Sequence, residues 1–373
     1  MIYLDYSATT PVDKDVLDTY VKVTNNFIGN PNSLHKLGTE AKALIDASTR
    51  QIADILGVNS DEIIYTSGAS EANNTAIKGI CFKYQNRGKH IITTNLEHSS
   101  IVAPLSYLQN LGFSVSFVNL DKNGKVDLED LKNKLQDDTI LVSIASVNSE
   151  IGIRQDLDEI GKIIKENSRA FFHSDITQSI GKEKVSLKYV DLASFSAQKF
   201  YGFKGIGVLY KKSNIVIEPL IHGGKSTTVF RSGTPPTALI ASTAKALRIV
   251  YEDFDKKYNY VKELNSYLKD NLSKMDNVFI NSNDYCIPHI INLSIKDIKP
   301  ETMQHMLEEY NIYISTKTAC SMNNVSQAVL ALTNDLDKAT HSIRISLSYK
   351  TSKEDVLEFL KCFKECMEKL KWK

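Results

Sequence analysis

The sequence lacks three features, and each absence excludes a class of protein. It has almost no net charge, because 45 Lys and Arg residues offset 44 Asp and Glu residues. A net charge of +1 gives no overall field that would attract nucleic acid or an acidic membrane surface. The N-terminus does not resemble a secretory signal, and no apolar run is long enough to span a bilayer. We therefore expect a cytoplasmic protein that binds neither nucleic acid nor membrane directly.

Cysteine is scarce and irregularly spaced. The chain has five cysteines, an odd number without zinc-knuckle spacing: Cys81, Cys286, Cys320, Cys362 and Cys366. This pattern favours free thiols over a disulfide framework. Cys362 and Cys366 stand four residues apart and could share a metal ion, but such a pair on an apolar helix face more often belongs to a core. We predict no metal site.

The length and the pattern of apolar runs predict the fold class. A chain of 373 residues favours two domains over one hydrophobic core. Short β-branched runs such as EIIYTSG, HIITTN and AFFHSDIT alternate with helical stretches such as DLDEIGKIIKEN. This alternation predicts an α/β fold with a mainly parallel sheet flanked by helices. We assign residues 16–250 to this large domain and residues 1–15 and 251–373 to a smaller α+β domain, with the boundary inside one long helix over 238–272.

Polar residues follow several of the predicted strands. His98 and Asn148 each come just after one, and Asp175 and Gln178 follow the apolar run FFHSD. Ligands of parallel α/β sheets bind beyond the carboxyl ends of the strands, so these residues are candidates for a binding site. A lone histidine is more often an ordinary polar residue, whereas a carboxylate after an apolar strand needs a cation or a protonated ring nitrogen nearby.

Small residues follow the strand EIIYT, in the segment SGASEANNTAIKG at 67–79. They lead directly into a predicted helix, whose N-terminal amides and dipole attract an anion such as a phosphate group. The alternative is an ordinary helix with a serine cap, which is a common feature.

Lys199 lies between a serine-rich and a glycine-rich run in SFSAQKFYGFKGIGVLY, residues 194–210. It could be solvated, form a salt bridge with Asp175, or act as a nucleophilic amine. The glycines after it permit a close approach of the chain to a ligand, which favours the third role. An amine, an acid and a helix N-terminus are the parts that hold pyridoxal 5'-phosphate (PLP) as a Schiff base. The residues therefore predict a PLP enzyme.

The motifs resemble those of the PLP-dependent cysteine desulfurases of the NifS/IscS type, within the class V aminotransferases. They span nearly the whole chain in order: YLDYSATTP, GNPNSLH, TSGASEANN, EHSSI, VNSEIG, HSDITQSIGK, SFSAQKFYGFKGIG, RSGT, TACS and HSIRISL. Each motif alone is weak, but the ordered series is specific. The resemblance implies PLP-dependent transferase fold type I and a homodimer.

The resemblance also implies a role for each matching residue. Lys199 would form the Schiff base, Asp175 would pair with the pyridine nitrogen of PLP, and His98 would stack on its ring. The other implied cofactor-binding residues are Gln178 and Asn148 near the ring hydroxyl, Ser70, Ala69, Ser196 and Gln198 around the phosphate, and Thr234 at the phosphate of the partner subunit. Arg344 would bind the substrate carboxylate, and Asn30 would line the substrate site.

The implied activity is the conversion of L-cysteine to L-alanine, with the sulfur captured as a persulfide on Cys320. Lys199 would take the α-proton, and His98 would carry a proton. Sulfur-acceptor proteins, such as an iron–sulfur scaffold or a tRNA thiolation enzyme, would then take the sulfur for iron–sulfur cluster assembly or tRNA thiolation.

Three positions depart from the family pattern. Gln198 replaces a histidine, Lys225 stands in a segment that is usually neutral to acidic, and TKTACS lacks a glycine before Cys320. Two alternatives therefore stay open. One is a related class V PLP lyase or aminotransferase acting on another amino acid, for example a selenocysteine lyase. The other is a non-catalytic binding paralogue.

Overall fold

The computed structural model describes residues 1–316 and 325–370. Its largest sheet has seven strands in the order β2-β8-β7-β6-β5-β3-β4. Neighbouring strands are parallel except at β8, which runs antiparallel to both β2 and β7. This confirms the mainly parallel sheet. The strands are β2 (Ile63–Thr66), β3 (His90–Thr93), β4 (Ser114–Phe117), β5 (Thr139–Ser143), β6 (Phe171–Asp175), β7 (Leu192–Ser196) and β8 (Gly207–Lys211).

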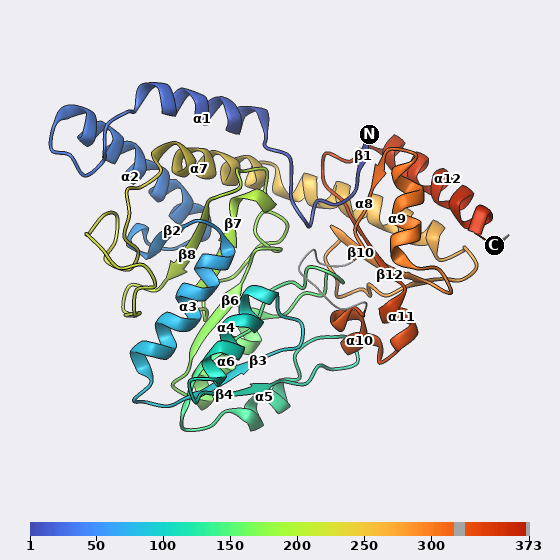
Figure 1. The fold of residues 1–373 in the computed structure, drawn as a ribbon, viewed down its shortest axis with the longest axis horizontal. Helices are drawn as coiled ribbons and strands as arrows, with labels where there is room; N and C mark the ends of the chain where they lie inside the picture. Colours follow the sequence, from blue (N-terminus) through green and yellow to red (C-terminus); the bar gives the residue numbers. More distant parts are fainter. Residues whose placement is uncertain (317–324, 371–373) are drawn as a thin grey trace.

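Helices cover both faces of this sheet (Figure 1). Successive strand residues point to opposite faces, so Ile63 and Ile64 belong to two different apolar clusters. Helices α3 (Ala69–Tyr84) and α4 (Ser99–Gln109) pack in the cluster of Ile64. Helices on the other face include α2 (Lys36–Leu56), α6 (Leu157–Asn167) and α7 (Thr237–Tyr251), and α1 (Lys14–Asn26) and α5 (Leu128–Lys134) pack beside α7 and α6.

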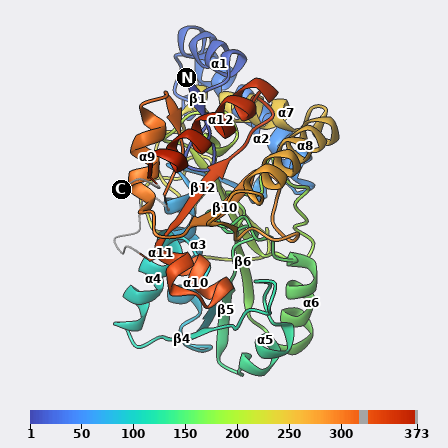
Figure 2. The same cartoon turned by 90° about the vertical axis from the view of Figure 1, so that its right-hand side faces the viewer.

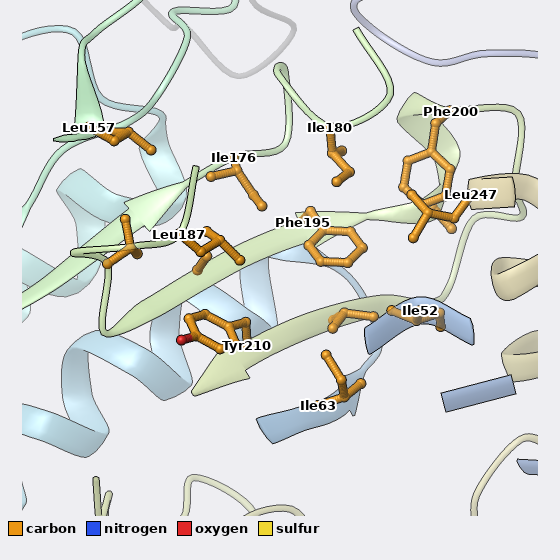
Figure 3. Packing of buried hydrophobic residues seen from close by; sticks show 14 of the residues in the cluster. Ile52, Ile63, Leu157, Ile176, Ile180, Leu187, Phe195, Phe200, Tyr210 and Leu247 are labelled. Atoms are coloured by element: carbon orange, nitrogen blue, oxygen red, sulfur yellow. The ribbon is translucent and has the colours of Figure 1, made fainter. Parts of the chain in front are cut away.

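Apolar side chains anchor the segments that end in polar residues. Ile176 directly follows β6, and Phe195 and Phe200 lie on either side of the short 3-10 helix η2 (Ala197–Lys199). All three side chains are buried in one cluster with Leu247 of α7 (Figure 3). Because this packing holds the backbone on both sides of the strand ends, the polar residues between these anchors have defined positions.

The long helix predicted over 238–272 is wrong, because the chain forms two helices there. Helix α7 ends at Tyr251 and α8 (Phe254–Leu272) begins after Asp253, whose φ of 50° lies in the left-handed region. Lys257 satisfies the carbonyls at the break, since its Nζ donates to the Ile249 oxygen at 2.5 Å and to the Glu252 oxygen at 2.6 Å. The apolar periodicity of the sequence continues through this break, so the sequence pattern does not indicate that the helix is interrupted.

A second apolar cluster joins α8 to the C-terminal part of the chain. Its sheet is antiparallel in the order β12-β10-β9, and a separate pair joins β1 to β11. The elements are β1 (Ile2–Tyr3), β9 (Val278–Ile280), β10 (Ile290–Ile295), β11 (Ile312–Tyr313), β12 (Ser342–Ser346), α9 (Pro300–Glu308), α10 (Gln327–Thr333), α11 (Leu336–Thr340) and α12 (Lys353–Leu370). Figure 2 shows α12 and α9 close to β12. Helices α10 and α11 share an apolar cluster with Leu96, Ile151 and Ile153, which lie in the loops after β3 and β5.

The separate cores support a division into two domains. Leu4 packs in the second cluster with residues of α8 and α12. We therefore propose the division into residues 16–250 and residues 1–15 with 251–373. Cys362 and Cys366 are buried in the second core as free thiols. Within the described part of the chain, no helix is both long and apolar enough to cross a membrane.

Candidate active site

A cavity of about 430 Å³ lies beyond the carboxyl ends of β2, β3, β5, β6 and β7. Since β8 alone is reversed, these five strands all end at the same edge of the sheet. Residues from the start of the chain and from β12 close its other side. The predicted site residues that line it are Lys199, Asp175, Gln178, His98, Ser70, Ala69, Ser196, Gln198 and Arg344.

Lys199 is half-buried at the cavity wall. Its Nζ donates to the backbone oxygens of Ser7 at 2.7 Å and Ala8 at 2.6 Å. The N-terminal segment is itself tied to the lysine's own loop, because the Thr10 amide donates to the Gln198 oxygen at 2.9 Å. The amine therefore faces the cavity from a rigid turn between β7 and β8.

Asp175 ends β6 and is buried, with 8% of its surface exposed. One carboxylate oxygen accepts from Asn73 Nδ2 at 2.8 Å and the other from the Thr177 amide at 2.9 Å. Both donors are neutral. The carboxylate is thus oriented by hydrogen bonds and still lines the cavity.

Asn73 extends this arrangement to His98. Its Nδ2 also donates to Ser100 Oγ at 2.9 Å, and Ser100 Oγ lies 2.8 Å from His98 Nδ1. The Ser100 amide donates to the same Nδ1 at 3.1 Å. Because Nδ1 accepts from a backbone N–H, the neutral ring carries its proton on Nε2. Motifs and residue types did not indicate a role for Asn73 or Ser100, although helical spacing places Asn73 on the buried face of α3 with Ala72, Ala76 and Ile77.

The start of α3 forms the end of the cavity best suited to an anion. Gly68 precedes the helix, and no side chain caps its first turn. The chain packs closely here, since a Cβ atom on Gly207 would lie 2.6 Å from Gly68 Cα. The first-turn amides of α3 and the hydroxyl residues Ser70 and Ser196 therefore offer hydrogen-bond donors to a phosphate.

Glu71 lies at the same end of the cavity and pairs with Arg231, whose Nε donates to its Oε1 at 2.9 Å. Burial alone would raise the pKa of Glu71, but hydrogen bonds from Arg231 and Ser67 hold the pKa below its ordinary value. The pairing limits the repulsion that this carboxylate would exert on an anion.

Arg344 extends from β12 of the smaller unit into the cavity and is 2% exposed. Its Nη2 donates to Asp5 Oδ1 at 2.7 Å and its Nη1 to the Ser149 oxygen at 2.9 Å. Its Nε is buried and has no hydrogen-bond partner among the described residues. The guanidinium is held at two points, and the two hydrogen bonds use two of its five N–H donors, so that the Nε–H and others can bind a ligand.

Three of the predicted site residues that the structure describes, Asn148, Asn30 and Thr234, do not line this cavity. Asn148 is buried, and its side chain bonds only to backbone groups, donating to the Leu96 oxygen and accepting from the amides of Glu150 and Ile151. It shapes the loop whose neighbours Val147 and Ser149 face the cavity. Asn30 and Thr234 are exposed, and Cys320 lies outside the described residues. Their roles stay predictions.

The cavity residues fit PLP. Lys199 would hold its aldehyde, Asp175 would face its pyridine nitrogen, and the start of α3 with Ser70 and Ser196 would hold its phosphate. His98 and Gln178 also line the cavity. The uncapped start of α3 and the buried Arg344 Nε both offer N–H donors to an anionic ligand in this cavity.

Comparisons with known proteins agree with this geometry. The aminotransferase class-V family profile matches residues 2–359. A Lactobacillus delbrueckii subsp. bulgaricus protein named NifS/IcsS protein homolog is 41% identical over 374 residues, covering 98% of this chain and 97% of the relative. A Dictyoglomus turgidum protein named cysteine desulfurase IscS is 38% identical over 376 residues, covering 99% and 95%.

Solved structures show the same fold over nearly the whole chain. A NifS-like protein superposes with a TM-score of 0.94 at 35% identity, covering 98% of this chain and 99% of the other. A structure of SspA in complex with cysteine gives a TM-score of 0.83 at 30% identity, covering 94% and 100%. Both likenesses extend across the large sheet and the smaller unit.

Proposed function

The chain belongs to the aminotransferase class-V family, and on that premise we propose that it is a PLP-dependent cysteine desulfurase. The observation that carries this function is the cavity in which Lys199, Asp175 and Arg344 meet. An amine, a buried carboxylate and a guanidinium with open N–H donors suit a reaction at the α-carbon of an amino acid. The names of two relatives, and the cysteine complex of the similar protein SspA, point to cysteine as that amino acid.

The residues divide the reaction among them. Bound PLP supplies an electron sink for the bond broken at the substrate α-carbon. Arg344 binds the substrate carboxylate, the Lys199 amine accepts the α-proton, and His98 carries a proton on Nε2.

Cys320 completes the reaction. Its thiolate attacks the substrate sulfur, so that an S–S bond forms on the enzyme while the substrate C–S bond breaks. The carbon then gains a proton and leaves as L-alanine. L-cysteine and one enzyme thiol are thus converted to L-alanine and one persulfide, with no external oxidant.

The variant Cys320→Ala tests the proposed sulfur transfer. We expect it to bind PLP as the wild type does and to form no persulfide, because the sulfur has lost its acceptor. Mass spectrometry of the protein after L-cysteine treatment measures the persulfide directly. Cys286→Ala is the matched control and should keep it, since burial raises the pKa of the Cys286 thiol to about 11. Undiminished alanine production by Cys320→Ala would instead support a lyase that does not use this thiol.

The variant Arg344→Lys tests the substrate clamp. Lysine cannot bond Asp5 and Ser149 and still present a fork to a carboxylate. We expect KM for L-cysteine to rise by about 10- to 100-fold, which is the change in affinity that the loss of one charge-assisted hydrogen bond produces. The change in kcat should be smaller. Steady-state kinetics measure this split, and the exposed Arg169→Lys is the control. An unchanged KM would remove Arg344 from the substrate site.

The enzyme's wider context follows from the same proposal. We infer a cytoplasmic homodimer that passes sulfur to an acceptor protein for iron–sulfur cluster assembly or tRNA thiolation. Thr234 is exposed on the segment before α7, which is consistent with a contact to the PLP phosphate of the partner subunit. Asn30 is likewise exposed and is proposed to reach the substrate site. A stable monomer in light scattering would contradict the dimer.

A further inference from the structure

Lys182 is a buried lysine that the proposed reaction does not use. It follows β6 in the turn after Asp175, and 7% of its surface is exposed. Within the described residues, no carboxylate lies at salt-bridge distance from its amine. Lysines are almost never this buried unless they are paired, so the position of Lys182 needs an explanation.

The Lys182 amine helps to fix which way the Gln178 amide points. Its Nζ lies 2.8 Å from Gln178 Oε1. The Ser7 carbonyl can only accept, so the atom of Gln178 that faces Ser7 must be the nitrogen, and the oxygen accepts from the Lys182 amine whether that amine is charged or neutral. The Gln178 nitrogen then faces the opposite way, where Nε2 donates to the Ser7 oxygen at 2.9 Å.

The Ser7 oxygen connects this pair to the catalytic lysine. It accepts from Gln178 Nε2 and from Lys199 Nζ, the latter at 2.7 Å. Gln178, Ser7 and Lys199 all line the cavity. Lys182 therefore stands behind the cavity wall and supports a chain of three hydrogen bonds that ends at the Lys199 amine.

The charges around Lys182 favour a neutral amine, because the nearby charged groups are cations rather than a carboxylate. Burial, and then the nearby cations Lys199 and Arg344, lower the pKa of Lys182 to about 7. The pKa of the buried His289 ring is lowered to about 3, by burial and then by the charge of Lys182. A neutral lysine amine still donates to Gln178, so the contact persists without a buried charge.

We propose that Lys182 is a positioning residue: its hydrogen bond fixes the Gln178 amide, and through the shared Ser7 oxygen it fixes the Lys199 amine in the cavity. This inference rests on the proposed PLP-dependent function. A purely structural lysine would fill space between β6 and the smaller unit without affecting the cofactor.

The variant Lys182→Met tests this role because it keeps the length of the side chain and removes the donor. We expect the Kd of the cofactor-free protein for PLP to rise about tenfold, as for one lost hydrogen bond at the site, and the absorption band of bound PLP to shift. Lys211→Met is the matched control. Lys211 is equally buried, but its Nζ bonds only to the backbone oxygens of Lys212 and Ile215, at the far end of β8.

A double-mutant cycle distinguishes positioning from packing. If Lys182 acts through Gln178, the double variant Lys182→Met, Gln178→Ala should bind PLP no more weakly than Gln178→Ala alone. Additive losses would overturn the proposal, as would a Lys182→Met protein whose Kd and absorption match those of the wild type and of Lys211→Met. Wild-type protein that fails to bind PLP would instead refute the proposed function.

A second variant serves if Lys182→Met does not fold. Gln178→Glu leaves an acceptor for Lys182 but removes the donor to the Ser7 oxygen. We expect the same weakening of PLP binding, and an unchanged Kd would overturn the proposal.

Discussion

Replacing Lys199 with alanine is expected to lower the turnover of L-cysteine by about 10⁴-fold or more and to remove the covalently attached PLP. Lys199 is the only lysine among the described residues that line the cavity. Within the described part of the chain, no other amine is therefore placed to hold the cofactor aldehyde or to accept the α-proton. Denaturing mass spectrometry after borohydride reduction measures the covalent link, and steady-state assays measure the rate.

Lys204→Ala is the control for this experiment. Lys204 lies in the same glycine-rich turn but is exposed and does not line the cavity. It should keep both the covalent link and the rate. A Lys199→Ala protein that retains more than a tenth of the wild-type rate would show that the amine is not where the structure places it.

Replacing Asp175 with asparagine is expected to lower kcat by about 10²- to 10³-fold. Both Asp175 oxygens accept hydrogen bonds, one from Asn73 and one from the Thr177 amide. An asparagine would turn its own NH₂ group toward one of these donors and would also remove the negative charge that suits a protonated pyridine nitrogen. Kinetics and PLP affinity measure the two consequences.

Asp191→Asn is the matched control because Asp191 is also buried at the sheet. It pairs with Lys165 at 2.5 Å, at the edge where β7 begins and so at the opposite end from the cavity. Its replacement should reduce thermal stability while the folded protein keeps its kcat. Equal losses of kcat in both variants would mean that the Asp175 effect comes from folding alone.

The fold class could be predicted because the strands and helices carry strong local patterns. The runs that contain β2 to β7 are apolar and β-branched, and α2 ends at Gly57, whose φ of 69° matches a glycine cap. Strand β8 was not predicted as a strand, because glycines at its start suggested only a turn. Its reversal depends on pairing with β2 and β7, which local sequence does not encode.

The candidate site could be predicted only in part. Motifs identified Lys199, Asp175 and Arg344, since their residue types carry the chemistry. They did not reveal Asn73 or Lys182. Asn73 matters because it bonds to Asp175, which lies more than a hundred residues away in the sequence, and Lys182 matters because it is buried. Asn148 was placed at the cofactor, but its side chain is used in backbone hydrogen bonds. Such roles follow from three-dimensional contacts rather than from sequence position.

The structure places two of the departures from the family pattern in different environments. Gln198 lines the cavity beside Lys199, so a neutral side chain stands where the family has a histidine. Lys225 is exposed and does not line the cavity. We infer that the change at Gln198 affects cofactor binding, whereas the change at Lys225 affects only the protein surface.

The most direct test of the central claim, that this cavity binds PLP and acts on L-cysteine, is one experiment on the purified protein. Its visible absorption spectrum is recorded before and after L-cysteine is added, and alanine and reductant-dependent sulfide are assayed in the same tube. The account predicts a PLP band that changes with L-cysteine, together with equal amounts of alanine and sulfide. A PLP band that L-cysteine leaves unchanged, with no alanine formed, would contradict it.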